Sequence, residues 1–153
     1  MGPPSSVTPS TNPIPLPVPP LVQVYRPRFK LIPKVLRVPI VPGADPRATY
    51  GDLVARGVAG IVLEAFGVGN MPDQRGSGWL PWLRAQRAAG LEVYLTSQCV
   101  RGPLAPELYR SGSIALEVGA HTTRMTPEAA VVKLMLCLAY PDVPASLPIA
   151  GEL

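Results

Sequence analysis

The loop after the most apolar stretch of the sequence carries the first candidate residues for chemistry. Residues 60–66 are apolar apart from Glu64, and they lead into a turn that holds Gly67, Gly69 and Asn70. Glycines supply the positive φ angles of a tight turn, and asparagine tolerates the left-handed region. Ligands gather at the carboxyl ends of the strands in an open parallel sheet, so we expect these residues to border a small-molecule site.

A second polar corner follows the next apolar stretch. Residues 91–95 predict a buried strand, after which the chain turns through Thr96, Gln98 and Cys99, the candidates for a corner that binds a small ligand. Two such strand ends in one short domain indicate one edge of a site. The matching nucleophile and base are missing from both clusters. The sequence therefore predicts part of a site.

Two groups of residues resemble a catalytic dyad, but each lacks the neighbouring charged group that would clearly activate it. His121, the single histidine, precedes Thr122 and Thr123, yet no neighbouring carboxylate is placed to orient its ring. Cys99 stands at a strand end, with Arg101 as the one nearby cation that could activate its thiol. A histidine in a surface turn and an inert, buried cysteine are the simpler interpretations. We predict no catalytic residue and no metal site in this chain.

Glu64 needs a partner, because carboxylates are rarely buried unless they are paired. The candidates are Arg37, Arg101 or a residue of a partner subunit. The glycine loop that follows does not fit a phosphate, because it lacks the lysine of a P-loop and the third glycine of the dinucleotide fingerprint. We therefore expect no nucleotide at this loop and no cofactor.

The elements that must position these residues alternate between strands and helices. The apolar pattern predicts strands at residues 35–41, 60–66 and 91–95, and helices at residues 48–56, 78–89, 104–118 and 127–139. Gly112 interrupts the third helix, and Thr126 caps the last one, with Pro127 at its first position. This alternation predicts an α/β fold: a three-layer α/β/α domain with a small, about four-stranded parallel sheet.

Composition divides the chain into a Pro-rich start and an almost neutral domain. Residues 1–44 hold 12 of the 21 prolines, no acidic residue and five cations, whereas residues 45–153 hold nine basic and ten acidic residues. We expect an extended, largely unpacked linker over residues 1–34, one domain over residues 35–140 and a Pro-containing tail over residues 141–153.

The same features exclude several classes of protein. The domain lacks a basic stripe with interleaved aromatic residues, which argues against a nucleic-acid partner. The sequence has no run of about 18 apolar residues, which argues against a membrane span. Cys99 and Cys137, both in apolar surroundings, are too few for a disulfide framework and fit a reducing compartment, so we expect the cytoplasm.

Four segments, taken in order, resemble the C-terminal domain of the L-asparaginase (asparaginase/glutaminase-like) family, including its related amidotransferase subunit. They are residues 37–43, with a Pro-Gly turn; residues 64–72, with Gly-x-Gly-Asn; residues 95–99, followed by Gly102; and residues 125–135, with Met-Thr-x-Glu-Ala and Lys-Leu. The similarity covers about residues 35–140. Each motif is short, and the ordered set carries the resemblance.

This resemblance implies an amidohydrolase that converts L-asparagine to L-aspartate and ammonia. In the family, the catalytic threonines, aspartate and lysine belong to a larger N-terminal domain. We expect that domain, or a partner chain, to supply them here, and we expect this chain alone to be inactive. The family also implies that the loop of residues 67–70 crosses a dimer interface and borders the neighbouring substrate. Some bacterial relatives with an effector site have arginine at the position of Glu64, which argues against an asparagine effector site here.

The remaining expectations concern partners. The closing helix is apolar on more than one face, which predicts packing against a second domain or a second copy, and we expect a homo-oligomer. The complete enzyme is left open between an asparaginase, a lysophospholipase-type fusion and a tRNA-dependent amidotransferase. The alternative is a free-standing, non-catalytic domain that self-associates or binds a small amino acid at the corner between Asn70 and Thr96.

Overall fold

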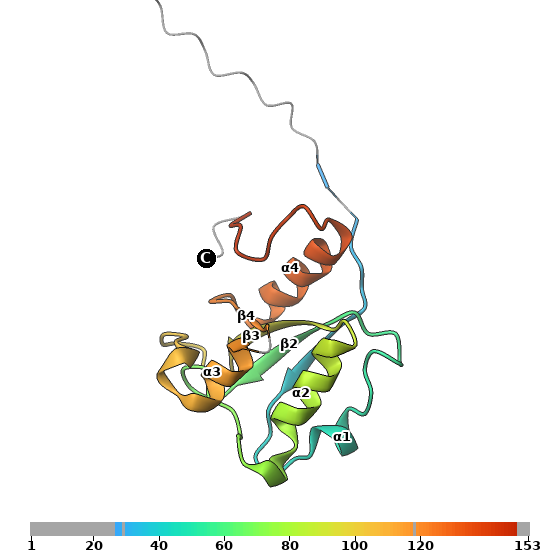
Figure 1. The fold of residues 1–153 in the computed structure, drawn as a ribbon. Coiled ribbons are helices and arrows are strands. Elements are labelled where there is room, and N and C mark those ends of the chain that lie inside the picture. Colours follow the sequence, from blue (N-terminus) through green and yellow to red (C-terminus); the bar gives the residue numbers. More distant parts are fainter. Residues whose placement is uncertain (1–26, 29, 118, 150–153) are drawn as a thin grey trace, which may run out of the picture.

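A computed structural model describes residues 27–28, 30–117 and 119–149. Residues 1–26 of the predicted linker, Val118 at the end of a predicted helix and residues 150–153 of the predicted tail lie outside the described residues. Four parallel strands form one sheet in the order β1 (Val35–Pro39), β2 (Gly60–Ala65), β3 (Glu92–Ser97) and β4 (His121–Thr122) (Figure 1). Every residue of β2 is buried, as expected for a central parallel strand.

Helices cover both faces of this sheet. They are α1 (Pro46–Thr49), α2 (Trp79–Ala88), α3 (Arg110–Glu117) and α4 (Pro127–Ala139), with short 3₁₀ turns η1 (Arg75–Ser77) and η2 (Pro106–Leu108). Successive strand side chains point to opposite faces, so Ile61 and Leu63 pack in the cluster with Trp79 of α2, whereas Val62 packs with Leu134 of α4. The predicted three-layer α/β/α fold is confirmed (Figure 1).

The first helix differs from its prediction. It covers Pro46–Thr49 instead of residues 48–56. Asp45 caps it by accepting a hydrogen bond from the Arg47 amide at 2.9 Å, and Pro46 occupies its first position. The chain that follows is held by Gln86, whose buried side-chain oxygen accepts from the amides of residues 53 and 54. That side chain replaces the helical bonds that the prediction required.

The segment over residues 104–118 also differs. It divides at Tyr109, whose φ of −125° and ψ of 140° are extended, so η2 ends there and α3 begins at Arg110. The prediction placed the interruption at Gly112, which lies inside α3. A Cβ at Gly112 would stand 2.3 Å from the carbonyl oxygen of Pro106, so this glycine permits close packing and does not break the helix.

The fourth strand was not among the three strands that the apolar pattern predicted. His121 and Thr122 pair with Tyr94 and Leu95 of β3, and both are exposed. A strand of two exposed residues has no apolar alternation, so the pattern carries no signal for it. The last helix agrees with its prediction, because Thr126 caps it and Pro127 begins it.

The end of the predicted linker contacts the domain. The Ile32 amide donates to the Met135 carbonyl at 3.1 Å, and Arg28 pairs with Asp142 at 2.8 Å. The Arg28 guanidinium also stands 4.9 Å from the centre of the Tyr140 ring. The chain therefore enters the domain beside the C-terminal end of α4 (Figure 1). Over its described residues, no helix is long and apolar enough to cross a membrane.

Candidate functional site

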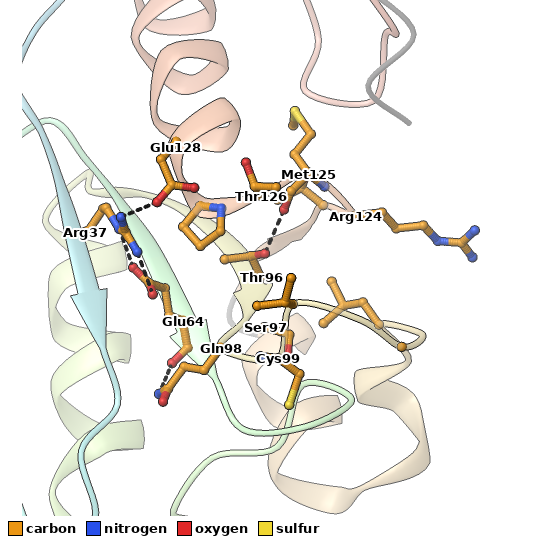
Figure 2. Close-up of a pocket in the computed structure, with 15 residues that line it drawn as sticks. Arg37, Glu64, Thr96, Ser97, Gln98, Cys99, Arg124, Met125, Thr126 and Glu128 are labelled. Carbon is orange, nitrogen blue, oxygen red and sulfur yellow. Dashed lines mark hydrogen bonds and ion pairs between the residues drawn. The ribbon is translucent and has the colours of Figure 1, made fainter.

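A cavity of about 320 Å³ opens at the carboxyl edge of the sheet. Its walls come from the ends of β2 and β3, the loop after β3 and the start of α4 (Figure 2). Four of the predicted site residues line it: Glu64, Thr96, Gln98 and Cys99. Parallel strands bring their carboxyl ends together in this way, and the predicted corner is therefore assembled. We call this space the Arg37 cavity, after the cation at its rim.

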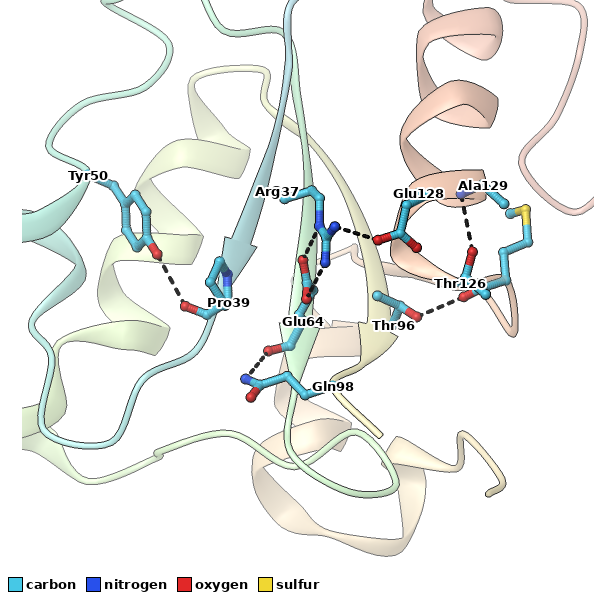
Figure 3. Close-up of polar contacts among 10 residues, drawn as sticks. Arg37, Pro39, Tyr50, Glu64, Thr96, Gln98, Thr126, Glu128 and Ala129 are labelled. Atoms are coloured by element: carbon cyan, nitrogen blue, oxygen red, sulfur yellow. Dashed lines mark hydrogen bonds and ion pairs between the residues drawn. The ribbon is translucent and has the colours of Figure 1, made fainter. Parts of the chain in front are cut away.

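Arg37 joins three elements at this cavity. Its Nε and Nη2 donate to the two carboxylate oxygens of Glu64 at 2.7 and 3.1 Å, and its Nη1 contacts Glu128 of α4 at 2.5 Å (Figure 3). Glu64 is only 6% exposed, so its charge needs this two-pronged partner. Of the three partners that the sequence allowed for Glu64, the structure selects Arg37.

The charged groups around Arg37 shift the pKa values of Arg37 and Glu128. Hydrogen bonding to Glu64, and the charges of Glu64 and Glu128, raise the pKa of Arg37 above its usual value. A hydrogen bond from its own backbone N–H, followed by the Arg37 charge, lowers the pKa of Glu128. Glu128 lies in the first turn of α4, where a helix favours negative charge. The raised pKa of Arg37 and the lowered pKa of Glu128 both favour the charged forms of these two side chains.

Thr96 and Gln98 connect the walls of the cavity. The buried Thr96 hydroxyl donates to the Met125 carbonyl at 3.0 Å, which ties β3 to the turn before α4. The Gln98 amide nitrogen donates to the Glu64 carbonyl at 2.8 Å (Figure 3). It also donates to the Ile40 carbonyl at 2.7 Å, which joins the ends of β1 and β2. Both side chains hold the frame of the corner together.

Cys99 is exposed, and the prediction that it is buried among apolar residues is wrong. Its backbone amide donates to the Ser97 hydroxyl at 3.0 Å, and that hydroxyl donates to the Gly67 carbonyl. These two bonds turn the chain outward after β3, which brings the thiol to the wall of the cavity. Cys137 is half-buried.

The predicted glycine loop with Gly67, Gly69 and Asn70 lies beside the cavity and does not line it. We call residues 66–71 the Asn70 loop. Gly67 and Gly69 adopt positive φ angles of 48° and 115°. Among the described residues no other type does, so Asn70 does not use the left-handed conformation that the sequence allowed for it. Its side-chain oxygen accepts from the Met71 amide at 2.9 Å and from the hydroxyl of Ser111.

His121 lies on β4 and has a carboxylate neighbour that the sequence analysis did not find. Its ring stands 6.0 Å from the Tyr94 ring, and its Nε2 lies 3.8 Å from a carboxylate oxygen of Glu92. The sequence did not anticipate Glu92 as a neighbour, because the two residues lie on different strands. This group is at the start of β3, away from the cavity. Among residues 27–28, 30–117 and 119–149, no cluster of side chains could hold a metal ion.

Three residues that matter to the site were not among its predicted members: Glu128, Arg124 and Ser111. Glu128 and Arg124 line the cavity, and Ser111 contacts Asn70. Topology could have found Glu128, because a helix that follows a parallel strand begins at the carboxyl edge of the sheet, and Thr126 marks that beginning. Ser111 had no such signal, since it is 41 residues from its partner.

Comparison with known proteins places the geometry in context. Residues 34–147 match the family described as the glutaminase/asparaginase C-terminal domain. The chain is 36% identical over 111 residues to a glutamyl-tRNA(Gln) amidotransferase component from Methanosarcina acetivorans, and the match covers 72% of this chain and 25% of that protein. It is 35% identical over 112 residues to an L-asparaginase from Thermococcus kodakarensis, and that match covers 72% of this chain and 33% of that protein.

Solved structures agree with these relatives. The thermostable L-asparaginase from Thermococcus kodakarensis superimposes with a TM-score of 0.73 and 31% identity, over 90% of this chain and 43% of that one. L-asparaginase I from Vibrio cholerae superimposes with a TM-score of 0.66 and 25% identity, over 78% of this chain and 37% of that one. The matches thus cover between 25% and 43% of the length of these proteins.

Proposed function

The chain belongs to the glutaminase/asparaginase C-terminal domain family, and we propose that it acts as the C-terminal domain of an amidohydrolase that converts L-asparagine to L-aspartate and ammonia. In this proposal the chain contributes a subunit interface and part of a neighbouring active site. A catalytic N-terminal domain or a partner chain supplies the nucleophile. The similarity to two L-asparaginases and to an amidotransferase component supports this assignment.

One observation carries the proposal: the carboxyl edge holds an ordered asparagine loop without the groups that cleave an amide. Amide hydrolysis needs a nucleophile, a base that orients it and donors for the developing oxyanion. Among the described residues, the hydroxyl and thiol groups at the cavity belong to Thr96, Ser97, Cys99, Thr123 and Thr126. Thr96 and Ser97 donate to backbone carbonyls, and Thr126 accepts from the Ala129 amide as the cap of α4. The carboxylate beside Thr126, Glu128, is paired with Arg37. His121 lies elsewhere. An edge of this kind is useful only beside a second domain.

Exposed apolar side chains support association with that domain or with a second copy. Val100 is 97% exposed, Leu108 is 68% exposed and Tyr109 is 50% exposed, and all three belong to the segment that borders the carboxyl edge. Val132 adds a further exposed apolar residue on α4. We propose a homo-oligomer on these grounds. The two free cysteines support a reducing compartment such as the cytoplasm, and the reaction requires no cofactor.

Reconstitution tests the proposal. The full 153-residue chain is expressed alone and together with the N-terminal domain of the Thermococcus kodakarensis L-asparaginase, and ammonia release from L-asparagine is measured. We expect no release from the chain alone and release from the pair. The intact relative is the positive control, and its N-terminal domain alone is the negative control. Release by the chain alone would contradict its predicted inactivity, and an inactive but stable pair would contradict its supporting role.

The Arg37 cavity favours a second candidate function, a free-standing domain that binds a small amino acid. Its rim carries two cations, Arg37 and Arg124, and two carboxylates, Glu64 and Glu128, which suits a zwitterion. Calorimetry of the chain with asparagine, aspartate and glutamine separates the two functions. Saturable binding to the chain alone supports this candidate, whereas a half-site should show none. Under the first proposal, a ligand is held only after the second domain closes the site.

A further inference from the structure

We infer that Ser111 is a positioning residue for Asn70, and that it orients the Asn70 side chain so that the amide nitrogen is a hydrogen-bond donor accessible at the carboxyl edge. The group that Asn70 meets is therefore an acceptor oxygen, such as a carboxylate or an amide carbonyl. The orientation of Asn70 follows from this chain alone. The identity of the acceptor, on a substrate or on the second domain, rests on the proposed function.

The backbone of the Asn70 loop is fixed before any partner arrives. The amides of Gly69 and Asn70 both donate to the Phe66 carbonyl, at 2.9 and 2.8 Å, and the Phe66 amide donates back to the Asn70 carbonyl at 2.8 Å. The positive φ angles of Gly67 and Gly69 allow a turn this tight. Asn70 therefore begins from one defined backbone position.

Residues at the start of η2 pack against the Asn70 loop. The Ala105 amide donates to the Val68 carbonyl at 2.8 Å, and Pro106 then packs between two glycines. A Cβ at Gly69 would stand 2.9 Å from the Cβ of Pro106, and a Cβ at Gly112 would stand 2.3 Å from its carbonyl oxygen. No side chain fits at either contact, so α3 approaches the loop closely. This approach brings Ser111 to Asn70.

The side chain of Asn70 is held through its oxygen. The Oδ1 atom accepts from the Met71 amide and from the Ser111 hydroxyl, and Ser111 is itself buried, with 4% of its surface exposed. A carbonyl oxygen has two lone pairs, so these two donors saturate it. The Met71 amide is shared between Asn70 Oδ1 at 2.9 Å and the Ser111 hydroxyl oxygen at 3.4 Å. Because this amide can only donate, the shorter contact disfavours the flipped orientation that would place Nδ2 against it.

The nitrogen of the same amide stays available. Within the described residues Nδ2 makes no hydrogen bond, yet no buried side-chain nitrogen or oxygen there lacks a partner. Nδ2 therefore reaches the surface with both protons free. An amide nitrogen donates and does not accept, so it selects an oxygen, and a charged oxygen gives the stronger bond. Asn70 thus discriminates in favour of a carboxylate or carbonyl group and against an ammonium group.

Nuclear magnetic resonance tests the orientation on the full chain. A long-range HNCO experiment detects a coupling between the Met71 amide nitrogen and Asn70 Cγ only when Oδ1 accepts that bond. We expect this coupling in the wild type, its loss in Ser111→Ala and its recovery in Ser111→Thr, which keeps the hydroxyl. Ser113→Ala, in the same helix, should leave it unchanged. A wild type without the coupling, or a Ser111→Ala variant that retains it in full, would overturn the positioning role.

Two substitutions at Asn70 test the donor role in the reconstituted pair. Asn70→Ala removes the donor, and we expect the KM for L-asparagine, or the dissociation constant of the pair, to rise about tenfold, the equivalent of one hydrogen bond to a charged group. Asn70→Asp keeps Oδ1 but replaces the donor with a second oxygen, so we expect a larger rise. A shift in KM identifies a substrate acceptor, and a shift in pair affinity identifies an acceptor on the second domain.

The coupling experiment and the Asn70 substitutions can fail independently of each other. The donor role would be overturned if Asn70→Asp had the affinity of the wild type, or a higher affinity than Asn70→Ala. A pair that never forms an active enzyme contradicts the proposed function, while the wild-type coupling still decides how Asn70 is oriented. Because the coupling is read in the wild type, this decision does not depend on whether the Ser111 variants fold.

Discussion

Two neighbouring regions of the carboxyl edge are held together by different forces. The Asn70 loop depends on close contact between glycines and Pro106 and on hydrogen bonds between uncharged groups. The Arg37 cavity depends on ion pairs that join β1, β2 and α4. The first region has no room for a Cβ at Gly69 or at Gly112, and it contains no titratable side chain. The second is open to solvent and is surrounded by charges.

This contrast explains how one edge can combine a rigid group with an adaptable one. Steric contacts and neutral hydrogen bonds fix a side chain in one orientation over a wide range of pH and salt concentration. Ion pairs with an exposed partner exchange easily with water, salt or a charged ligand. We therefore expect substitutions that change volume to damage the loop, and substitutions that change charge to alter the cavity.

The largest effect is expected from Gly112→Ala. The new methyl group would overlap the carbonyl oxygen of Pro106, which stands 2.3 Å from its position, so α3 must move away from η2. We expect a loss of about 2 to 3 kcal/mol in the free energy of unfolding, typical of an overpacked contact. Urea unfolding measures it.

Gly76→Ala is the matched control for this substitution. No atom stands within 4 Å of a Cβ at Gly76, and its φ is not positive, so its stability should hardly change. Equal stability of the two alanine variants would mean that the loop is not held by close packing, and the contrast with the cavity would disappear.

A smaller effect is expected from Glu64→Gln, which changes charge at nearly constant volume. Glu64 is 6% exposed and its carboxylate receives two hydrogen bonds from Arg37, of which the glutamine amide can accept only one. We expect a loss of about 1 to 3 kcal/mol, the range for a hydrogen bond to a charged group. Urea unfolding at low and high salt measures the loss and its screening.

The exposed Glu107 provides a control for the change of charge alone. Glu107→Gln should leave the stability nearly unaltered. In Glu64→Gln the coupling between Met71 and Asn70 should persist, because the Asn70 loop makes no bond to the ion pairs. Loss of that coupling would show that the two regions are one unit, contrary to the comparison.

Much of the fold could be predicted because its signals are local. β2 is apolar throughout, α2 has a broad apolar face, and α4 has a threonine cap followed by proline. The first helix was misplaced because Gln86, more than 30 residues away, holds the chain that a helix was expected to form. Asp45 followed by Pro46, and a glycine at position 51, were the local signs in the sequence that the helix is short, and Gly51 has a positive φ in the structure.

The site was predicted to a smaller extent, because its contacts join distant residues. The apolar neighbours of Glu64 in the sequence predicted that its carboxylate is paired, and Arg37 was one of the candidate partners. The Asn70 loop was recognised from its glycines, but the bond to Ser111 depends on how η2 packs, which no local pattern encodes. Cys99 was misjudged for a related reason: hydrogen bonds of Ser97 turn the chain outward there.

The smallest effect is expected from Glu128→Gln, and it should depend on pH. The pKa of Glu128 is lowered in the folded chain by its own backbone N–H and by Arg37. A carboxyl group whose pKa is lower when folded stabilises the fold above its unfolded pKa, and this contribution disappears as the pH falls through the folded pKa. The wild type should therefore be slightly more stable than the variant at neutral pH, and the difference should vanish in acid.

Urea unfolding of the wild type and Glu128→Gln, measured in steps from about pH 7 to about pH 3, tests this sign, since the unperturbed pKa of glutamate lies between these values. Glu117→Gln is the control, because Glu117 is exposed and has no ion pair among the described residues. A difference that grows as the pH falls would mean that Glu128 is unfavourable in the folded state. The Arg37 cavity would then hold one carboxylate too many, and a cationic ligand at its rim would become the better explanation.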